Sequence, residues 1–304
     1  MARALFIGSR SPLTAGALSG WLASGNEVAE FWAEAPGVKP RRFGAPRVSP
    51  DGLIARHRIP NVTVPRLSKW PGLMRAVAAS GADLLITCAT QMIVPKVMLA
   101  HFGTRAVNLH PAMLPEYRGP SPYLPMLLDG RGDSHGGTTL HVLSPGIDEG
   151  DIIGQEAVPY SEAGGRFGPW YAALIVASHG LMRDALPRYL DGDLAAYPQV
   201  GGSYAKVTLP LALEAGLGAA QVRQMLERGG STMEMAVLLP GRKRPVRVTE
   251  VLRAGLLTGE APRLRTLSVD MDFADARLRL RRATGLERAL ERQRLAAALR
   301  PLQL

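Results

Sequence analysis

The sequence has few of the groups that form covalent cross-links or span membranes. Its single cysteine, Cys88, excludes an intrachain disulfide and a thiolate metal cluster. Cys88 lies in the apolar run ADLLITCAT, where we expect a buried packing residue. No apolar run reaches the roughly 18 residues that a transmembrane helix needs. The N-terminal stretch MARALFIGSRSP predicts a buried strand rather than a signal peptide, so a cytoplasmic location is expected.

Nucleotide-binding and metal-binding motifs are also missing. The stretch GSRSP after the first predicted strand is not a GxGxxG motif and lacks the lysine of a P-loop. His135 and His141 do not have the spacing of paired metal ligands. We therefore expect no metal.

The first 110 residues alternate between strand-like and helix-like segments. The apolar run ALFIGS is followed by a helix for which Ser11 is the expected N-cap, Pro12 the first helical residue and Gly25 the stop. This alternation predicts an α/β fold, with a mostly parallel twisted sheet and helices on both faces. Ligands of such sheets bind beyond the carboxyl ends of the strands.

The composition changes after residue 205. Short segments with alternating apolar residues follow, separated by turn residues: TMEMAVLLP, RPVRVTEVL, RLRTLSVDM and ARLRLRRA. Such alternation is typical of a small β-barrel or sandwich, and the last piece, GLERALERQRLAAALR, is an amphipathic helix. We therefore divide the chain into a first domain, residues 1–205, and a C-terminal OB-like β domain with a terminal helix, residues 206–304.

Asn108 and His110 lie at the end of a predicted strand, in the stretch AVNLHPAMLPEYRGPSPY. Residues two apart on a strand face the same side, so the two side chains present an amide and an imidazole to one point. This pair suits acyl transfer, because the amide can donate to an oxyanion and the imidazole can add charge or move a proton. Alternatively, both side chains only satisfy local backbone groups.

A second candidate element is the turn SPGIDEGDII, which contains Asp148 and Asp151. A carboxylate beside an imidazole raises the pKa of the histidine and selects its tautomer. Alternatively, the aspartates only form the hydrogen bonds of a turn. These residues alone do not decide which aspartate would face the histidine.

The formal net charge is +10, and residues 241–304 carry 15 Arg and Lys against 7 Asp and Glu. Such a basic segment suggests a polyanionic partner, and the alternating RLRLR segment, residues 277–281, would present one basic face. The alternative is a solvated sheet face in an arginine-rich protein. A basic loop earlier in the chain carries Lys39, Arg41, Arg42 and Arg47.

Several of these elements together resemble the formyltransferase family that uses 10-formyltetrahydrofolate. NLHPAMLPEYRG, GGTTLH and GIDEGDII occur in the order and spacing of the family motifs. The layout is most similar to methionyl-tRNA formyltransferases, which end in a barrel-like domain of this size. The resemblance implies a Rossmann-like catalytic domain for residues 1–205, and it places the family's aspartate at Asp148.

The resemblance also implies roles for individual residues. Asn108 and a protonated His110 would stabilise a tetrahedral oxyanion, and Asp148 would orient His110 and help proton transfer. Arg118 and Gly119 would border the acceptor amine. The pterin ring of the folate would be held by two segments, formed by Gln91, Met92, Ile93 and Val94 and by Ser144, Pro145, Gly146 and Ile147.

Two departures from the family concern the acceptor. Transfer-RNA formyltransferases usually carry Trp-Pro-Gly-Ala after the helix AAQVRQMLER, where this chain has GGSTMEMAV, and the preceding Ile-Asp-Trp signature is missing from KVTLPLALEAGL. We therefore expect an N-formyltransferase acting on a small amine, such as an amino sugar or a biosynthetic intermediate. The alternatives are a methionyl-tRNA formyltransferase that binds tRNA through its basic C-terminal domain, a formyltetrahydrofolate hydrolase, and a folate-binding protein without catalysis.

Overall fold

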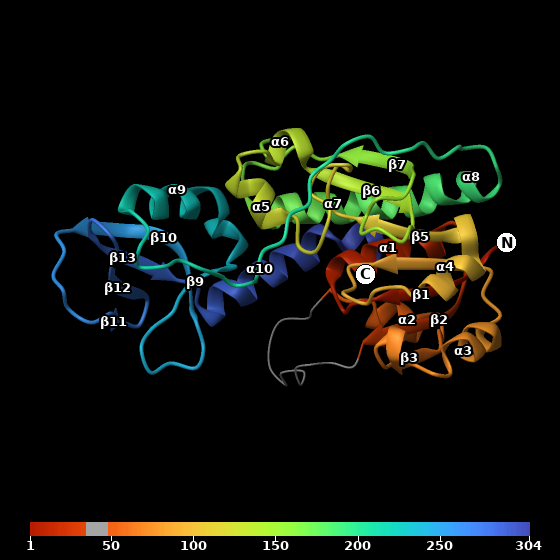
Figure 1. The fold of residues 1–304 in the computed structure, drawn as a ribbon, viewed down its shortest axis with the longest axis horizontal. Coiled ribbons are helices and arrows are strands. Elements are labelled where there is room, and N and C mark those ends of the chain that lie inside the picture. Colours follow the sequence, from red (N-terminus) through yellow and green to blue (C-terminus); the bar gives the residue numbers. More distant parts are fainter. Residues whose placement is uncertain (35–47) are drawn as a thin grey trace.

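The computed structural model describes residues 1–34 and 48–304. Within these ranges, a pair of β-sheets lies toward opposite ends of an elongated molecule (Figure 1). The basic loop with Lys39, Arg41, Arg42 and Arg47 lies outside the described residues. No helix in the described ranges is long and apolar enough to cross a lipid bilayer.

The first sheet confirms the predicted mostly parallel α/β fold. Its strands are β1 (Arg3–Gly8), β2 (Glu27–Glu34), β3 (Asn61–Val64), β4 (Leu84–Cys88), β5 (Ala106–His110), β6 (Gly137–Val142) and β7 (Ile152–Ala157). Their order is β3-β2-β1-β4-β5-β6-β7. Pairing is parallel from β3 to β5, whereas β6 and β7 are antiparallel to their neighbours.

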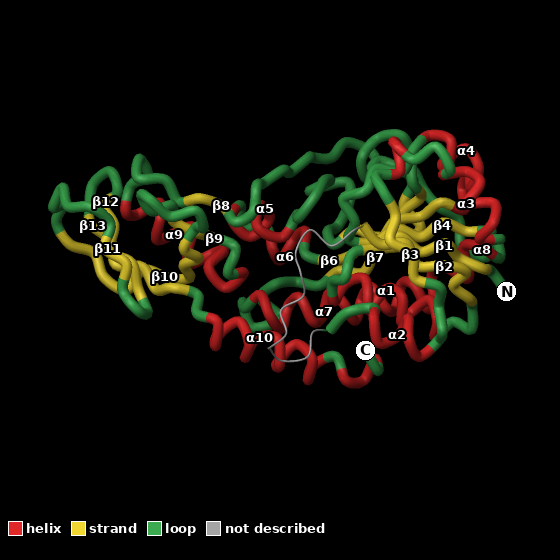
Figure 2. The backbone as a smooth tube through the Cα atoms, turned by 90° about the horizontal axis from the view of Figure 1, so that it is seen from below, coloured by secondary structure: helices red, strands yellow, loops and turns green. Residues whose placement is uncertain are grey.

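Helices cover both faces of this sheet (Figure 2). One face carries α1 (Pro12–Ala23), α2 (Asp51–Arg56) and α7 (Phe167–Gly180), and the other carries α3 (Leu73–Ser80) and α4 (Lys96–Phe102). Because successive strand residues point to opposite faces, Phe6 of β1 packs in the first apolar cluster, while Leu5 and Ile7 pack in the second. The central strands are therefore apolar on both faces, as the sequence predicts.

The start of α1 follows the predicted capping pattern. Ser11 accepts a hydrogen bond from the Thr14 amide at 3.2 Å, Pro12 is the first helical residue, and Gly25 adopts a left-handed conformation after the helix ends. A Cβ atom at Gly20 of α1 would lie 2.2 Å from the carbonyl oxygen of His179. Glycine at this position therefore allows α1 and α7 to pack in direct backbone contact.

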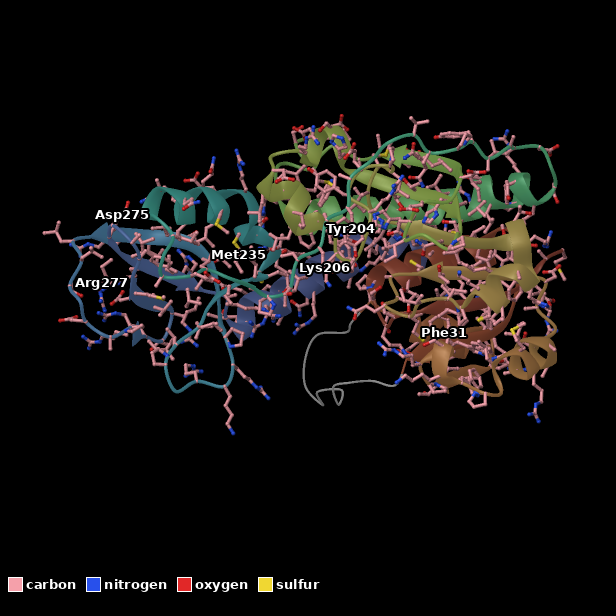
Figure 3. The ribbon with its side chains drawn as sticks, viewed as in Figure 1. Phe31, Tyr204, Lys206, Met235, Asp275 and Arg277 are labelled. Atoms are coloured by element: carbon pink, nitrogen blue, oxygen red, sulfur yellow. The ribbon has the colours of Figure 1, made fainter. Side chains whose placement is uncertain are left out.

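Short elements complete the N-terminal portion of the chain. They are η1 (Leu67–Lys69), η2 (Gly103–Arg105), α5 (Tyr123–Leu128), α6 (Gly132–His135), the π-helical turn η3 (Leu181–Ala185) and α8 (Leu186–Leu190). A connecting segment with Tyr204 and Lys206 then runs toward the second sheet (Figure 3).

The second sheet is a half-barrel, as expected for the C-terminal region. It contains β8 (Leu211–Ala212), β9 (Met235–Val237), β10 (Val246–Gly255), β11 (Arg263–Leu264), β12 (Ser268–Asp272) and β13 (Arg277–Arg282), and it is accompanied by α9 (Ala219–Gly229) and η4 (Gly230–Thr232). The strand order is β11-β12-β13-β10-β9-β8. Alternate residues such as Leu278 and Leu280 pack with Val222 and Leu226 of α9 in a core of their own.

The terminal helix α10 (Gly285–Ala298) links the two sheets. It begins with a capping box in which Thr284 and Glu287 bond each other's backbone amides. It then runs back along α7, and Leu299 joins the core of the first sheet before η5 (Arg300–Leu302). The division of the chain at residues 205 and 206 remains a prediction; the sheets lie on either side of it, and α10 extends from the second sheet to the first.

Candidate active site

The tip of β5 carries Asn108 and His110 to the carboxyl edge of the first sheet. β5 lies between β4 and β6, so Asn108 is level with Thr87 on one side and with His141 on the other. The Asp148 turn follows β6 and reaches the same place, because the Asp148 carboxylate lies against both Asn108 and His110. The structure therefore brings the three predicted catalytic residues together.

The amide of Asn108 is held in one orientation. Its Oδ1 accepts a hydrogen bond from the Thr87 hydroxyl at 2.8 Å, and its Nδ2 lies 3.0 Å from Nε2 of His141 and 3.2 Å from Oδ1 of Asp148. Nδ1 of His141 lies 2.8 Å from the Val142 carbonyl and donates to it, and Nε2 lies 3.6 Å from Oδ1 of Asp148. A flipped amide would turn its oxygen toward the Asp148 carboxylate, which cannot donate when ionised, so this contact fixes where the Asn108 donor points.

Asp148 connects the two residues of β5. One carboxylate oxygen accepts from Asn108, and the other lies 3.4 Å from Nδ1 of His110 and accepts from the Gly119 amide at 2.8 Å. Asp148 has a φ of 54°, in the left-handed region that non-glycine residues rarely occupy. Such strain persists only where surrounding contacts hold it, and it is common at functional sites.

Both ring nitrogens of His110 face oxygen acceptors. Nε2 lies 2.9 Å from the Tyr117 carbonyl, and Nδ1 faces Asp148. Only the imidazolium form donates from both nitrogens, so the geometry suits a positively charged ring. Burial nevertheless lowers the pKa of His110 below its ordinary value, while the charge of Asp148 opposes this shift. The ring can therefore release its proton readily, as a group that transfers protons must.

The carboxyl group of Asp148 is strongly acidic. Burial raises its pKa, but the His141 ring, the charge of His110 and the Gly119 amide together outweigh burial and lower the pKa to about 2. Asp148 is consequently ionised at neutral pH. Its carboxylate is a negative charge beside His110, and its expected role in orienting His110 remains a prediction.

Gln199 fastens the loops around this cluster. Its Nε2 donates to the carbonyl oxygens of Asp148 and Gly150 at 3.0 and 2.6 Å, and its Oε1 accepts from Arg118 at 2.9 Å. Arg118 also donates to the Gly201 carbonyl at 3.0 Å. The guanidinium therefore holds two loops together, and its expected place beside the acceptor remains a prediction.

The two segments predicted to hold the pterin ring follow β4 and β6. Met92 and Val94 pack in the same apolar cluster as Leu143, which precedes the second segment. Ile93 and Ile147 instead expose 68% and 46% of their surface. Large apolar side chains on both segments are thus accessible to a flat ring, but binding there remains a prediction.

Two other sequence features lie outside the cluster. Asp151 is exposed, so Asp148 is the aspartate that faces the histidine. The pentapeptide GDSHG, residues 132–136, has the GxSxG pattern of serine hydrolases. Ser134, however, lies in the short helix α6 and bonds the ring of its neighbour His135 at 2.7 Å. This pentapeptide therefore does not form the strand-to-helix elbow of those enzymes.

Sequence reasoning did not identify Thr87, His141 and Gln199 as site residues. Each of these residues contacts a site residue that is distant in the chain, so no motif of fixed spacing could predict the contact. The one available signal for His141 was its position in the strand GGTTLHV, which would pair beside the Asn108 strand only if the order of strands were already known.

Comparisons with known sequences identify a segment of the chain. Residues 52–164 match the family described as Formyl transferase. A methionyl-tRNA formyltransferase from Listeria monocytogenes is 34% identical over 126 residues, which cover 41% of this chain and 39% of that relative. The match thus spans well under half the length of the curated relative.

Solved structures resemble a larger share of the chain. An N-formyltransferase from Helicobacter canadensis, crystallised with folinic acid and dTDP-3-aminofucose, superposes with a TM-score of 0.57 and 12% identity and covers 93% of this chain and 100% of its own. HypX from Aquifex aeolicus superposes with a TM-score of 0.60 and 16% identity, covering 92% of this chain and 43% of its own. At these identities the similarity shows the shared fold.

Proposed function

We propose that this chain, whose residues 52–164 match the formyl transferase family, transfers a formyl group from 10-formyltetrahydrofolate to the amine of a small molecule. The observation that carries the proposal is the contact of Asp148 with both Asn108 and His110. An amide donor, an imidazole and an ionised carboxylate at one strand tip are the groups that acyl transfer to an amine requires.

The reaction would begin with attack of the amine nitrogen on the formyl carbon. A carbon–nitrogen bond forms, and the formyl oxygen becomes an oxyanion that Asn108 Nδ2 and the imidazolium of His110 stabilise. The bond between the formyl carbon and N10 of the folate then breaks, and the proton lost by the amine is transferred to N10. Asp148 holds His110 in place and takes part in this proton transfer.

The formyl donor would bind across the ends of β4 and β6. Ile93 and Ile147 expose apolar surface on either side of that edge, which suits the faces of a pterin ring. The solved N-formyltransferase from Helicobacter canadensis was crystallised with folinic acid, a folate derivative, and this supports a folate donor for the same fold.

Two observations favour a small amine over transfer RNA. The same Helicobacter enzyme, which was crystallised with dTDP-3-aminofucose, shares its fold with 93% of this chain. In addition, the three arginines of the RLRLR strand are paired with carboxylates: Arg277 with Asp272, Arg279 with Asp270 and Arg281 with Glu250. This strand therefore presents little uncompensated charge to a phosphate backbone.

Methionyl-tRNA remains the second candidate acceptor, because the curated relatives that match a segment of the chain carry that name. Hydrolysis of 10-formyltetrahydrofolate is the third candidate, since it would use the same three residues with water as the attacking group.

One experiment separates these functions. The full chain is incubated with 10-formyltetrahydrofolate alone, with a panel of amino sugar nucleotides, and with methionyl-tRNA, and release of tetrahydrofolate is followed. We expect release only with a small amine. Rapid release without any amine would identify a hydrolase, and release only with methionyl-tRNA would establish the second candidate.

A further inference from the structure

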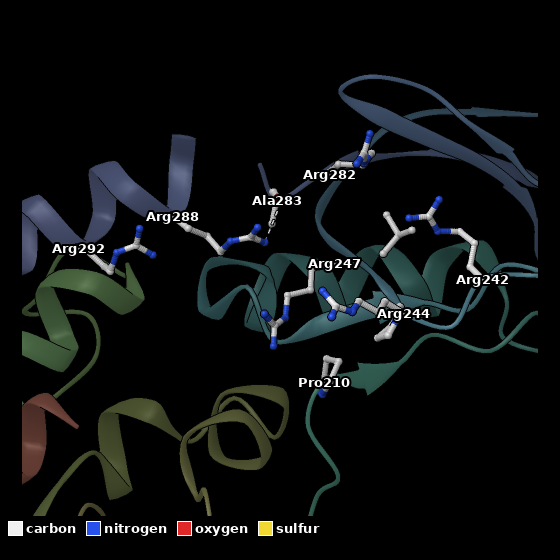
Figure 4. A pocket seen from close by; sticks show the side chains of 10 residues that line it. Pro210, Arg242, Arg244, Arg247, Arg282, Ala283, Arg288 and Arg292 are labelled. Carbon is white, nitrogen blue, oxygen red and sulfur yellow. Dashed lines mark hydrogen bonds between the residues drawn. The ribbon is translucent and has the colours of Figure 1, made fainter. Parts of the chain in front are cut away.

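A hollow of about 560 Å³ lies between the second sheet and the terminal helix (Figure 4), and none of its lining residues belongs to the candidate active site. Its walls come from the chain just before and within β10, from the end of β13 and from α10. Six arginines line it: Arg242, Arg244, Arg247, Arg282, Arg288 and Arg292. The other four lining residues are uncharged, so this hollow concentrates positive charge.

The arginines of the hollow differ from the other arginines of the second sheet. Arg277, Arg279 and Arg281 of β13 are each paired with a carboxylate, and Asp270 of β12 accepts from both Arg265 and Arg279 at 2.8 and 2.6 Å. Around the hollow, Arg247 reaches Glu234 at 3.2 Å. Within the described ranges, neither Arg242 nor Arg244 lies within ion-pair distance of an acidic side chain. Among the residues that the structure describes, the charges of Arg242 and Arg244 are therefore not compensated by an ion pair.

Two of these arginines have unsatisfied donors. The Nε atoms of Arg247 and Arg292 are buried and lack a hydrogen-bond partner among the residues that the structure describes. A buried donor without an acceptor is unfavourable, and proteins rarely leave one unpaired. The two side chains come from opposite walls, β10 and α10, so an acceptor between them could satisfy both (Figure 4).

We propose that this arginine hollow is a binding site for a compact phosphate-bearing ligand, a diphosphate or triphosphate ester. Guanidinium groups match the oxygen atoms of phosphate with paired hydrogen bonds, and several of them converge here. The volume of the hollow falls in the range of small-molecule sites. A duplex nucleic acid could only lie across the opening and would leave the inward-facing donors unpaired. The site shares no residue with the Asn108 cluster, so it is independent of the proposed transfer reaction.

The test measures binding of inorganic pyrophosphate and of a nucleoside diphosphate to the full chain by calorimetry. We expect both to bind and to compete with each other. Arg244→Gln and Arg292→Gln should each raise the Kd at least about tenfold, as loss of a charged hydrogen bond does. Arg292→Lys keeps the charge but loses the paired donors, and it should restore only some of the affinity.

The matched control is Arg253→Gln. Arg253 is an exposed arginine on the same strand as Arg247, about 20 Å away at the usual rise of a strand. This variant loses the same charge and should bind pyrophosphate as the unmodified chain does. Circular dichroism spectra and melting temperatures of all variants identify any that fail to fold.

Three outcomes would overturn the proposal. The first is absence of pyrophosphate binding to the unmodified, folded chain. The second is an equal loss of affinity in Arg253→Gln and Arg244→Gln, which would mean that general charge and not the hollow is responsible. The third is tight binding of transfer RNA that pyrophosphate does not displace and that the hollow variants weaken, which would assign the hollow to RNA. None of these outcomes depends on formyl transfer.

Discussion

Replacement of Asp148 by asparagine tests the electrostatics of the site directly. The substitution keeps the shape of the side chain but removes its charge and its titration. In the folded protein the pKa of Asp148 is lowered from 3.8 to about 2 by its contacts with His141, His110 and Gly119. A lowered pKa stabilises the folded state above pH 3.8, and this contribution is lost as the pH falls toward 2.

The size of the effect follows from the shift. A difference of nearly two pKa units corresponds to about 2 kcal/mol of stability at neutral pH. Because the unfolded chain binds the proton near pH 3.8, about 1 kcal/mol of this is already lost at pH 3. The side chain of Asp148 is only 13% exposed, so solvent screens the interaction little. The Asp148→Asn variant lacks this loss, since asparagine does not titrate.

Urea unfolding between pH 7 and pH 3 measures the difference. Fluorescence of the buried tryptophans Trp21, Trp32 and Trp170 reports unfolding around the first sheet. The unmodified chain should lose about 1 kcal/mol more than the Asp148→Asn variant over this range, whereas Asp151→Asn, at an exposed site, should follow the unmodified chain. Parallel pH profiles for the unmodified chain and Asp148→Asn would refute the interpretation that the cluster holds an ionised carboxylate.

Two further predictions concern the residues that position the cluster. Thr87→Val leaves Oδ1 of Asn108 without its donor, so it should reduce kcat about tenfold and the free energy of unfolding by about 1 kcal/mol. Thr87→Ser keeps the hydroxyl and should retain most of the activity and stability. Equal activity of the two variants would contradict the role of the hydroxyl. Gly119 has a φ of 101°, and Gly119→Ala would place a Cβ 2.7 Å from the ring of Tyr204. This variant should therefore lower the melting temperature more than Gly164→Ala, where φ is 73° and no atom lies near the added Cβ. Equal shifts in melting temperature would mean that backbone strain alone is measured.

The elements of the fold that the sequence could predict depend on local chemistry. The cap at Ser11 and Pro12, the apolar parallel strands and the alternating strands of the second sheet all follow from residues close together in the chain. The position of α10 could not be predicted in this way. Its amphipathic pattern indicates a helix with one apolar side, but not that this side would return to α7.

The same distinction holds for the site. The pairing of Asn108 with His110 is local and could be predicted from strand periodicity. The positions of Asp148 and Asp151 in the turn did not indicate which of them faces the histidine, and only the resemblance to a family selected Asp148. The support from Thr87 and His141 depends on which strands lie beside β5. Strand order is set by packing over the whole sheet, so no short motif contains it.

The most direct test of the proposed transfer is amine-dependent release of tetrahydrofolate from 10-formyltetrahydrofolate by the unmodified chain and by Asn108→Ala, His110→Ala and Asp151→Asn. Asn108→Ala and His110→Ala should each reduce kcat by roughly a hundredfold or more, as loss of an oxyanion donor does, while Asp151→Asn should stay near the unmodified rate. Near-native transfer by either Asn108→Ala or His110→Ala would show that the strand tip of β5 does not stabilise the oxyanion.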